Sequence, residues 1–436
     1  MTILNHQGSQ LHSKTIAVES LGCKLNQAEQ EEIFRQFIHA GWRSAVSPSK
    51  ADVYVLNTCT VTHVADRKVR QRIRWVRRNN PQAHIIAIGC YAHQAPEQLL
   101  AAGADLVLNN CDKINLPGLL DAENAASSIE ASPIGGTISL GRTRSLVRIQ
   151  SGCNHNCSFC IVPSTRGYSQ SVPLEQVIAL VRERVNEGYK EIILTGTEIG
   201  DYCSEGQGIS DLIREILAKT DIERLRLSSL QPHELSSDLL NLWTTNRLCN
   251  HLHISLQSGS DPVLRRMQRS YDTTTFRAIV LTARKAIHDL AITTDVIVGF
   301  PGESDAEFEE SLRFCQDMEF SSMHVFPFSP RPGTVAATLL PQVKETIKKD
   351  RIRVMLHLAH STSHSFREQF LGQVLTVLWE KEASNGTWNG LTTNGIRVFL
   401  EDHYGNSGPS LSNCILPVRI VSTNAQGLCG QLINTL

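Results

Sequence analysis

Short apolar runs alternate with amphipathic helical patterns along the first third of the chain. Runs at residues 15–20, 52–56 and 84–88 are followed by helical periodicity at residues 27–39, 61–78 and 95–102. This alternation predicts strands joined by crossover helices, and hence a parallel α/β sheet. Each apolar run ends just before a cysteine, at Cys23, Cys59 and Cys90. Because ligands bind at the carboxyl ends of parallel strands, we expect these three thiols to meet at one sheet edge.

The alternation continues through the middle of the chain. Residues 121–139 are rich in Ala, Ser and Gly, and we interpret them as a linker. Six strand-like runs follow, with helical patterns between them such as residues 174–187 and 275–290. They predict a partial or full (βα) barrel whose site lies at the carboxyl ends of the strands. The six runs cover residues 146–150, 191–195, 224–229, 251–256, 294–300 and 323–328.

A long charged helical pattern at residues 343–369 ends this part, and the sequence then changes from helical to strand-like patterns. Five short β-type runs with Gly and Asn turns predict a small β-barrel. They cover residues 373–379, 386–392, 396–401, 415–422 and 428–433. We therefore expect an α/β protein of three domains: a parallel α/β domain at 1–135, a partial (βα)6 barrel at 136–366, and a small β-barrel at 367–436.

Composition narrows the class of protein. The length of 436 residues fits about three domains. Apolar residues at 41% and charged residues at 19% exclude a chain too polar to bury a core. The net charge of −1 gives no overall electrostatic field that would indicate binding to nucleic acid or to a membrane surface. Without a long apolar run or a secretion signal, we expect a cytoplasmic protein with no membrane contact. Twelve cysteines are too few for a disulfide scaffold, so patterned ones indicate metal or catalysis.

The tightest cysteine pattern comes directly after the first barrel strand, in GCNHNCSFC. Cys153, Cys157 and Cys160 are three closely spaced thiols, which suit a soft metal centre. Iron–sulfur clusters normally take four thiolates, so three would leave one iron open for chemistry. The alternative is a zinc site. Zinc prefers four ligands, yet no second C-x-x-C motif follows, and His155 inside the loop is the available fourth ligand.

This three-then-two spacing is similar to that of the radical S-adenosylmethionine (SAM) enzymes, whose open iron binds SAM. Phe159 stands where an aromatic side chain of that family packs near the adenine. Three later stretches resemble its SAM-binding segments, for the amino group, the ribose and the adenine in turn. The matching positions are Gly196 and Thr197, then Ser255 and Gln257, then Val296 and Gly299.

The whole chain resembles the radical SAM methylthiotransferases. The N-terminal motifs LGCKLNQAE, NTCTVTHVADRK and GCYA, the central RIQSGCNHNCSFC and LTGTEIGDY, and a C-terminal barrel similar to a TRAM domain carry this resemblance. It implies insertion of a methylthio group at carbon 2 of N6-threonylcarbamoyladenosine at position 37 of tRNA, beside the anticodon. Alternatives are the branches acting on isopentenyladenosine or on a ribosomal protein aspartate, and a non-catalytic metal-bearing RNA-binding protein.

The resemblance also implies the cofactors. A 4Fe–4S cluster on Cys153, Cys157 and Cys160 would cleave SAM to a radical, using an electron donor. A second 4Fe–4S cluster on Cys23, Cys59 and Cys90 would carry the sulfur, although three buried structural thiols remain the alternative there. The chain is expected to act as a monomer. The remaining cysteines are interpreted as incidental: Cys111, Cys203, Cys249, Cys315, Cys414 and Cys429.

Residues 67–78 (RKVRQRIRWVRR) form a basic amphipathic helical pattern. Five arginines share about 100° of the helical wheel, and Val69, Ile73 and Val76 lie on another face. Such a stripe binds RNA phosphates without sequence preference, or is simply a solvated helix face. In the C-terminal barrel, Arg397 with Trp388 and Phe399 is a second candidate RNA contact, and Arg331 a third at the barrel mouth. The stripe arginines are Arg67, Arg70, Arg74, Arg77 and Arg78.

Overall fold

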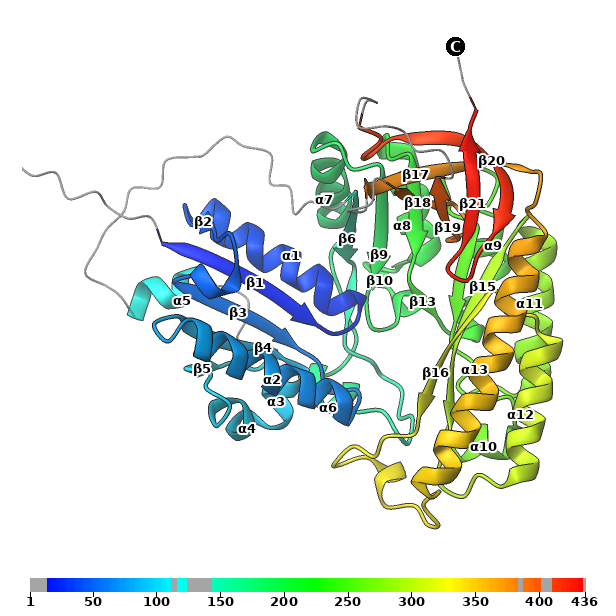
Figure 1. The fold of residues 1–436 in the computed structure, drawn as a ribbon, viewed down its shortest axis with the longest axis horizontal. Coiled ribbons are helices and arrows are strands. Elements are labelled where there is room, and N and C mark those ends of the chain that lie inside the picture. Colours follow the sequence, from blue (N-terminus) through cyan, green and yellow to red (C-terminus); the bar gives the residue numbers. More distant parts are fainter. Residues whose placement is uncertain (1–13, 111–115, 124–142, 383–386, 401–409, 434–436) are drawn as a thin grey trace, which may run out of the picture. The chain divides into compact units, whose positions relative to one another are not determined.

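The computed structural model describes residues 14–110, 116–123, 143–382, 387–400 and 410–433. The chain divides into two compact units, Met1–Ile138 and Ser139–Leu436 (Figure 1). The predicted domain boundary near residue 135 and Cys111 fall outside the described residues. The first residues of the predicted linker belong instead to helix α5 (Leu116–Glu123). Within the described residues, no helix is both long and apolar enough to cross a membrane.

The N-terminal unit is a parallel sheet with strand order β2-β1-β3-β4-β5. Helices α1 (Lys24–His39) and α2 (His63–Asn79) follow β1 and β3, as the periodicity predicted. In this doubly wound order, β2 and β3 lie on opposite sides of β1, so the crevice at the carboxyl ends of β1 and β3 is the expected ligand site. The strands are β1 (Thr15–Leu21), β2 (Arg43–Ser44), β3 (Val53–Thr58), β4 (His84–Gly89) and β5 (Leu106–Val107).

The helix predicted at residues 95–102 is α4 (Pro96–Leu100), and a short helix that was not predicted, α3 (Cys90–Gln94), precedes it. Ala95 between them has φ −152° and ψ 65°, outside the helical region. A residue that precedes proline is disfavoured in the α region, so Pro96 ends one helix and begins the next. As a result, Cys90 is the first residue of a helix rather than part of a loop.

The central part of the second unit is an open (βα) barrel, which confirms the predicted partial barrel. Its parallel strands follow one another around the barrel in chain order, and the described strands β6 and β16 have no pairing with each other. Helices α7 (Leu174–Asn186), α8 (Ile209–Lys219), α11 (Thr273–Ala286), α12 (Asp305–Asp317) and α13 (Glu345–Glu368) cover its outside (Figure 1). The strands are β6 (Arg144–Arg148), β9 (Glu191–Thr195), β12 (Arg224–Leu227), β13 (Ser229–Leu230), β14 (His251–Ile254), β15 (Ala291–Val298) and β16 (Ser322–Pro327).

Side chains alternate along these strands between two environments. Leu225, Leu252 and Val296 belong to the apolar core shared with the helices. Arg226, His253 and Asp295 lie beside them in the chain and point to the barrel interior, since successive side chains of a strand point to opposite faces. This part of the barrel interior is therefore polar.

The C-terminal part is a closed barrel of strand order β17-β18-β19-β21-β20, as predicted. Two arginines of β12 fix it to the amino ends of the central strands. Arg224 donates to the carbonyl oxygens of Thr376 and Leu391, each at 2.9 Å, and Arg226 donates to that of Thr393 at 3.0 Å. The small barrel thus closes the floor of the central barrel. Its strands are β17 (Val374–Glu382), β18 (Trp388–Thr392), β19 (Arg397–Leu400), β20 (Ile415–Thr423) and β21 (Leu428–Leu432).

Candidate active site

The three cysteines of the N-terminal unit lie at the carboxyl edge of its sheet. Cys23 follows β1, Cys59 follows β3 and Cys90 follows β4. A Cβ at Gly22 would lie 3.0 Å from Cβ of Cys59, so the loop bearing Cys23 packs directly on Cys59. Cys23 caps helix α1 and Cys90 begins helix α3.

A buried polar network holds the three loops together. The Asn26 amide donates to Oδ1 of Asn57 at 3.0 Å and to the Thr58 carbonyl at 3.2 Å. The Thr58 hydroxyl donates to the Ile88 carbonyl at 2.6 Å and accepts from the backbone N–H of Ala92 at 3.2 Å. These bonds tie together the segments that follow β1, β3 and β4, and so fix where the three thiols stand.

In the second unit, the loop with the cysteine triplet is held by Gln150 and shaped by Gly152. The Gln150 side chain is fully buried, donates to the Gly152 carbonyl at 2.8 Å, and accepts from the backbone N–H groups of Thr197 and Glu198 at 3.0 Å each. Gly152 has φ +82°, and a Cβ there would lie 2.0 Å from the Tyr168 carbonyl. Only glycine fits this position, and Gln150 couples the loop to the segment after β9.

Each sulfur of the triplet has a polar neighbour. Backbone N–H groups of His155 and Val162 donate to the sulfurs of Cys153 and Cys160 at 3.4 and 3.5 Å. The Arg269 guanidinium donates to the sulfur of Cys157 at 3.0 Å. N–H donors and a cation beside sulfur suit thiolate ligands. Burial, together with the nearby Glu198 carboxylate, raises the pKa of the Cys153 thiol well above its usual value. Metal binding must therefore displace a proton there.

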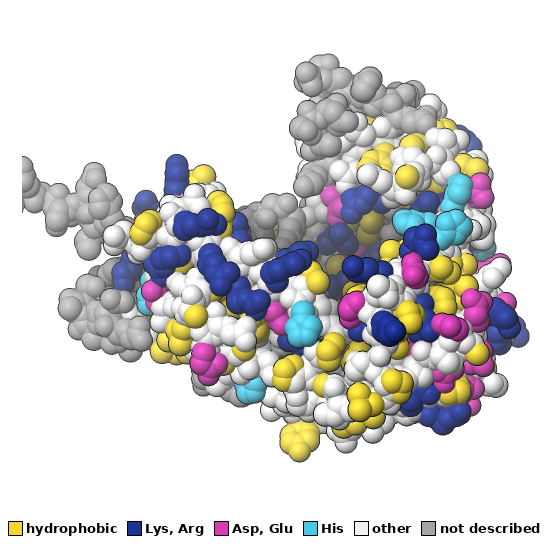
Figure 2. Space-filling view, turned by 60° about the horizontal axis from the view of Figure 1, so that its bottom comes forward, with side chains coloured by type: hydrophobic (Ala, Val, Ile, Leu, Met, Phe, Trp, Pro, Cys, Tyr) yellow, Lys and Arg dark blue, Asp and Glu magenta, His cyan; other side chains and the backbone are white. Residues whose placement is uncertain are grey.

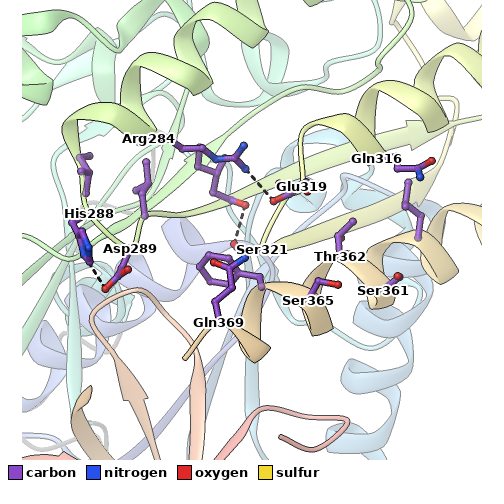
Figure 3. Close-up of a pocket in the computed structure, with 15 residues that line it drawn as sticks. Arg284, His288, Asp289, Gln316, Glu319, Ser321, Ser361, Thr362, Ser365 and Gln369 are labelled. Carbon is purple, nitrogen blue, oxygen red and sulfur yellow. Dashed lines mark hydrogen bonds and ion pairs between the residues drawn. The ribbon is translucent and has the colours of Figure 1, made fainter. Parts of the chain in front are cut away.

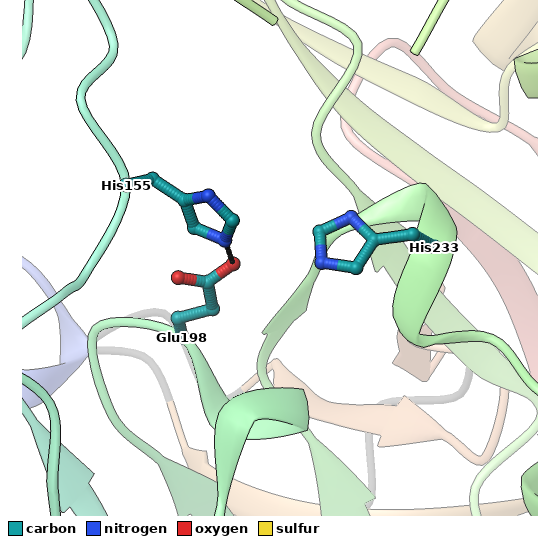
Figure 4. Close-up of side chains that lie close together, drawn as sticks. All are labelled: His155, Glu198 and His233. Atoms are coloured by element: carbon teal, nitrogen blue, oxygen red, sulfur yellow. Dashed lines mark ion pairs between the residues drawn. The ribbon is translucent and has the colours of Figure 1, made fainter. Parts of the chain in front are cut away.

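Beside this loop, His155, Glu198 and His233 converge (Figure 4). Nε2 of His155 lies 2.8 Å from Oε1 of Glu198, whose Oε2 lies 3.1 Å from the sulfur of Cys153. Glu234 also meets Glu198, and burial with this second carboxylate raises the pKa of Glu234. Glu234 therefore favours its protonated form beside Glu198.

The residues predicted to contact SAM all lie at carboxyl ends of barrel strands. Gly196 and Thr197 follow β9, and the buried Thr197 hydroxyl has no hydrogen-bond partner among the described residues. Gly299 has φ +71°, and a Cβ there would lie 2.4 Å from Cγ of Lys348. Phe159 packs edge-on against Phe300, with ring centroids 6.3 Å apart. The unsatisfied Thr197 hydroxyl marks a place for a ligand, whereas glycine at 299 is required by its packing against Lys348.

The other three residues predicted to contact SAM are Ser255, Gln257 and Val296, and each has a different environment. The Ser255 carbonyl accepts a hydrogen bond from the Tyr271 hydroxyl at 2.5 Å. Gln257 adopts φ +69° and pairs with β15, its N–H donating to the Asp295 carbonyl at 2.8 Å. The Val296 side chain is fully buried in the helix-facing core, so a ligand at the strand end would meet its backbone rather than its side chain.

Comparison with known proteins agrees with this geometry. Residues 147–315 match the Radical SAM superfamily, and residues 15–109 match the Uncharacterized protein family UPF0004. The threonylcarbamoyladenosine tRNA methylthiotransferase MtaB of Bacillus subtilis is 37% identical over 89% of this chain and 90% of its own length. The chain belongs to the radical SAM methylthiotransferase family. A relative from Endomicrobium trichonymphae named tRNA-2-methylthio-N(6)-dimethylallyladenosine synthase is 33% identical over 88% of this chain and 93% of its own.

Solved structures confirm the fold. The radical SAM methyltransferase TsrM of Kitasatospora setae, with cobalamin and a 4Fe–4S cluster bound, superposes with a TM-score of 0.54 at 13% identity, covering 74% of this chain and 77% of its own. As a member of the family, the chain is an enzyme that uses SAM and 4Fe–4S clusters. The thiols with N–H and guanidinium donors, and the unsatisfied Thr197 hydroxyl, fit those groups.

The basic stripe lies on α2, and Figure 2 shows a row of Lys and Arg side chains across the N-terminal unit. Val69, Ile73 and Val76 are buried, as expected of the other face. Arg77 is engaged within the fold: it donates to the Gly103 carbonyl at 3.0 Å and to Asp105 at 2.5 Å. Arg74, Arg77 and Arg78 line a groove of about 450 Å³ with Gln71 and Ala102. Arg70 donates to Tyr91 and Gln98, while Arg67 makes no hydrogen bond or ion pair within the described part of the chain.

The two other predicted RNA contacts are engaged in the fold. Arg331 is only 4% exposed, although it lies at the barrel mouth. Arg397 pairs with Glu380 at 3.2 Å and donates to Asn389 at 2.5 Å, which bridges three strands of the small barrel. Trp388 belongs to that barrel's core. Of the residues predicted to bind RNA, Arg67, Arg74 and Arg78 of α2 are therefore the exposed ones.

A polar cavity of about 500 Å³ lies among the ends of α11, α12 and α13 (Figure 3). Arg284 extends across it and donates to the carbonyl oxygens of Met318 and Glu319. The guanidinium thus caps the C-terminal end of α12. The cavity includes Leu290, Ile292 and Ser321, next to the amino ends of β15 and β16. That face of such a barrel serves stability, whereas chemistry occurs at the carboxyl ends.

Several residues of the site escaped sequence reasoning. Gln150 and Arg269 support the cysteine loop, and Glu198 with Glu234 and His233 lies beside it. Only Gln150 carried a local signal, because it stands between the first strand and the first cysteine. The others come from loops more than 40 residues away from Cys153 in the chain, so their proximity depends on the fold.

Proposed function

We propose that this enzyme inserts a methylthio group at carbon 2 of N6-threonylcarbamoyladenosine at position 37 of tRNA, beside the anticodon. The observation that carries this proposal is the 36–37% identity, over 86–89% of the chain, to relatives from Bacillus subtilis and Thermotoga maritima that are named for this nucleoside. The second candidate is the isopentenyl-type adenosine, because a relative named for the dimethylallyl nucleoside is 33% identical over a similar span.

In this proposal, Cys153, Cys157 and Cys160 hold the SAM-cleaving cluster, and Cys23, Cys59 and Cys90 hold the sulfur-carrying cluster. When bound, the clusters and SAM supply the radical and the sulfur needed to functionalise an unactivated C–H bond. The protein positions them. Gln150 and Gly152 fix the triplet loop, Arg269 complements the Cys157 sulfur, and Thr197 offers its hydroxyl to SAM.

The sharpest test of the substrate is mass spectrometry of tRNA nucleosides. Cells lacking the gene should accumulate N6-threonylcarbamoyladenosine and lose its methylthio form completely, and a plasmid copy should restore it. Loss of the methylthio form of isopentenyladenosine instead would favour the second candidate. If all tRNA nucleosides are unchanged while a ribosomal protein loses a methylthio group, the tRNA proposal is wrong.

We further propose that the α2 stripe binds tRNA phosphates through Arg67, Arg74 and Arg78. These are the stripe arginines least engaged by the fold, and Arg74 and Arg78 line the groove beside Ala102. An electron donor, a monomeric state and a cytoplasmic location also belong to this proposal, since the tRNA pool and the reductants that clusters require are found there.

Changing Arg74 to Gln should weaken tRNA binding about equally for all sequences. Removing one phosphate-binding arginine should reduce the slope of log affinity against log salt by about one unit. Arg72→Gln is the matched control on the same helix, because Arg72 is committed to Glu19 at 2.5 Å and stacks on Trp75. Equal slopes for wild type and Arg74→Gln would remove Arg74 from the RNA interface. Filter binding over a salt series measures this.

A further inference from the structure

Three adjacent strands present a cluster of polar side chains to the interior of the central barrel. His253 on β14, Asp295 on β15 and His324 on β16 lie on one face, because Asp295 pairs in register with His324, and His253 with Thr293. The opposite face of the same strands carries Leu252, Val296 and Met323 in the helix-facing core. Burial of these alternating apolar residues leaves the histidines and the aspartate facing inward.

Asp295 holds the two imidazoles. Its Oδ1 lies 3.1 Å from Nδ1 of His324, and its Oδ2 lies 3.3 Å from Nε2 of His253. The rings stack with centroids 5.7 Å apart. Nδ1 of His253 lies 2.9 Å from the Thr293 hydroxyl, so both nitrogens of that ring are engaged. Within the described residues, Nε2 of His324 has no partner, and 58% of the side chain is exposed.

An exposed aromatic ring stands beside this imidazole. Phe326 follows His324 by two residues on the same face of β16, and it is 41% exposed. Exposed Phe rings are the platforms on which proteins stack unpaired bases, and polar groups beside them read the base edge. β16 is also the last described strand of the open barrel, so both side chains stand next to its opening.

The group lies directly below the predicted SAM contacts. The N–H of Gln257 donates to the Asp295 carbonyl, and the Gln257 carbonyl accepts from the N–H of Ile297, each at 2.8 Å. The floor below is closed by the small barrel through Arg224 and Arg226. The open edge of the barrel beside β16 thus gives a base a route to the predicted SAM contacts that passes His324 and Phe326.

We propose that Phe326 and His324 form the receptor for the modified base. Phe326 stacks on the adenine ring, and His324 donates its Nε2–H to the carboxylate of the threonylcarbamoyl group. Asp295 orients the imidazole, and His253 fixes Asp295 from the other side. This assignment rests on the proposed function and deepens it, because the dimethylallyl substituent of the second candidate has no charge for His324 to contact.

Binding of anticodon hairpin RNAs tests this directly. One hairpin carries the free acid of N6-threonylcarbamoyladenosine, and a second carries its methyl ester. Because the hydrogen bond from His324 to a charged carboxylate forms only with the free acid, wild type should bind the free-acid hairpin about tenfold more tightly than the ester hairpin. His324→Gln should bind both hairpins equally, at the wild-type affinity for the ester. His360→Gln, on the exposed side of α13, should keep the tenfold preference. Phe326→Ala should weaken both hairpins about equally, since stacking ignores the charge.

The outcomes separate this inference from the proposed function. If wild type fails to methylthiolate the free-acid hairpin, the proposed function is wrong. If wild type modifies it but His324→Gln keeps the tenfold preference, the assignment of His324 is wrong. The three side chains also offer atoms close enough to bind one metal ion. If wild type holds an additional metal ion that His324→Gln lacks, while the cluster iron is the same in both, the base receptor is wrong and the three side chains form a metal site. Asp295→Asn should reduce the preference for the free acid, because the imidazole of His324 loses the carboxylate that orients it.

Discussion

Replacing Cys153 by alanine should abolish formation of 5′-deoxyadenosine, while replacing Cys59 should spare it in part and abolish only methylthio insertion. The reason is that the two sets of three cysteines belong to different compact units of the chain. Cys153 lies in the second unit on the loop gripped by Gln150, whereas Cys59 lies in the N-terminal unit beside Gly22. Each variant should lose one cluster and keep about four of the roughly eight irons per chain.

Anaerobic reconstitution followed by iron and sulfide analysis, with chromatography of SAM products, measures both effects. Cys414→Ala is the matched control, because Cys414 lies in the C-terminal barrel, distant in sequence from both groups, and should change neither iron nor products. If Cys153→Ala and Cys59→Ala abolish SAM cleavage equally, the assigned division of roles is wrong. Zinc in place of iron in wild type would support the alternative metal site.

A second large effect is expected at Glu191, where the central and small barrels meet. Glu191 is fully buried and binds Arg226 at 2.7 Å, with Arg144 at 4.0 Å. Burial alone would raise the pKa of Glu191, yet Arg226, and then Arg144 and Arg224, hold it below its usual value. Glu191→Gln leaves these buried arginines without a counter-charge, which should cost about 3–5 kcal/mol of stability in the second unit.

Thermal unfolding and proteolysis of the small barrel measure this loss. Glu223→Gln is the control: Glu223 pairs with Lys190 on the exposed surface, and such pairs contribute about 1 kcal/mol or less. Because the pKa of Glu191 is depressed in the folded state, its contribution is present above the unfolded pKa and is lost as the solution is acidified toward the folded one. An equal change in both variants would show that Glu191 does not anchor the barrel.

Periodicity predicted most of the fold because each strand and helix is a local pattern. The run at residues 191–195 is β9 itself, and the thiols after β1, β3 and β4 reached one edge because parallel strands share their direction. Helix α3 was missed because its five residues, Cys90–Gln94, are too few to show helical periodicity.

Side-chain partnerships were beyond the sequence. The wheel placed Arg77 on the basic stripe, but it did not show that the loops at Gly103 and Asp105 fold back against it. Similarly, nothing in the sequence links Asp295 to His253 and His324, because the pairing register of three strands decides which residues face each other. The chemical residue types were visible in the sequence, whereas their neighbours depend on long-range packing.

The attachment of the small barrel has an evolutionary consequence. Arg224 and Arg226 recognise it through backbone carbonyl oxygens, of Thr376, Leu391 and Thr393 among others. A carbonyl oxygen is the same whatever side chain its residue carries, so these bonds place little demand on the identity of the small barrel's residues. Its outer surface is therefore free to diverge while the barrel stays attached, and barrels exchanged between relatives should still dock.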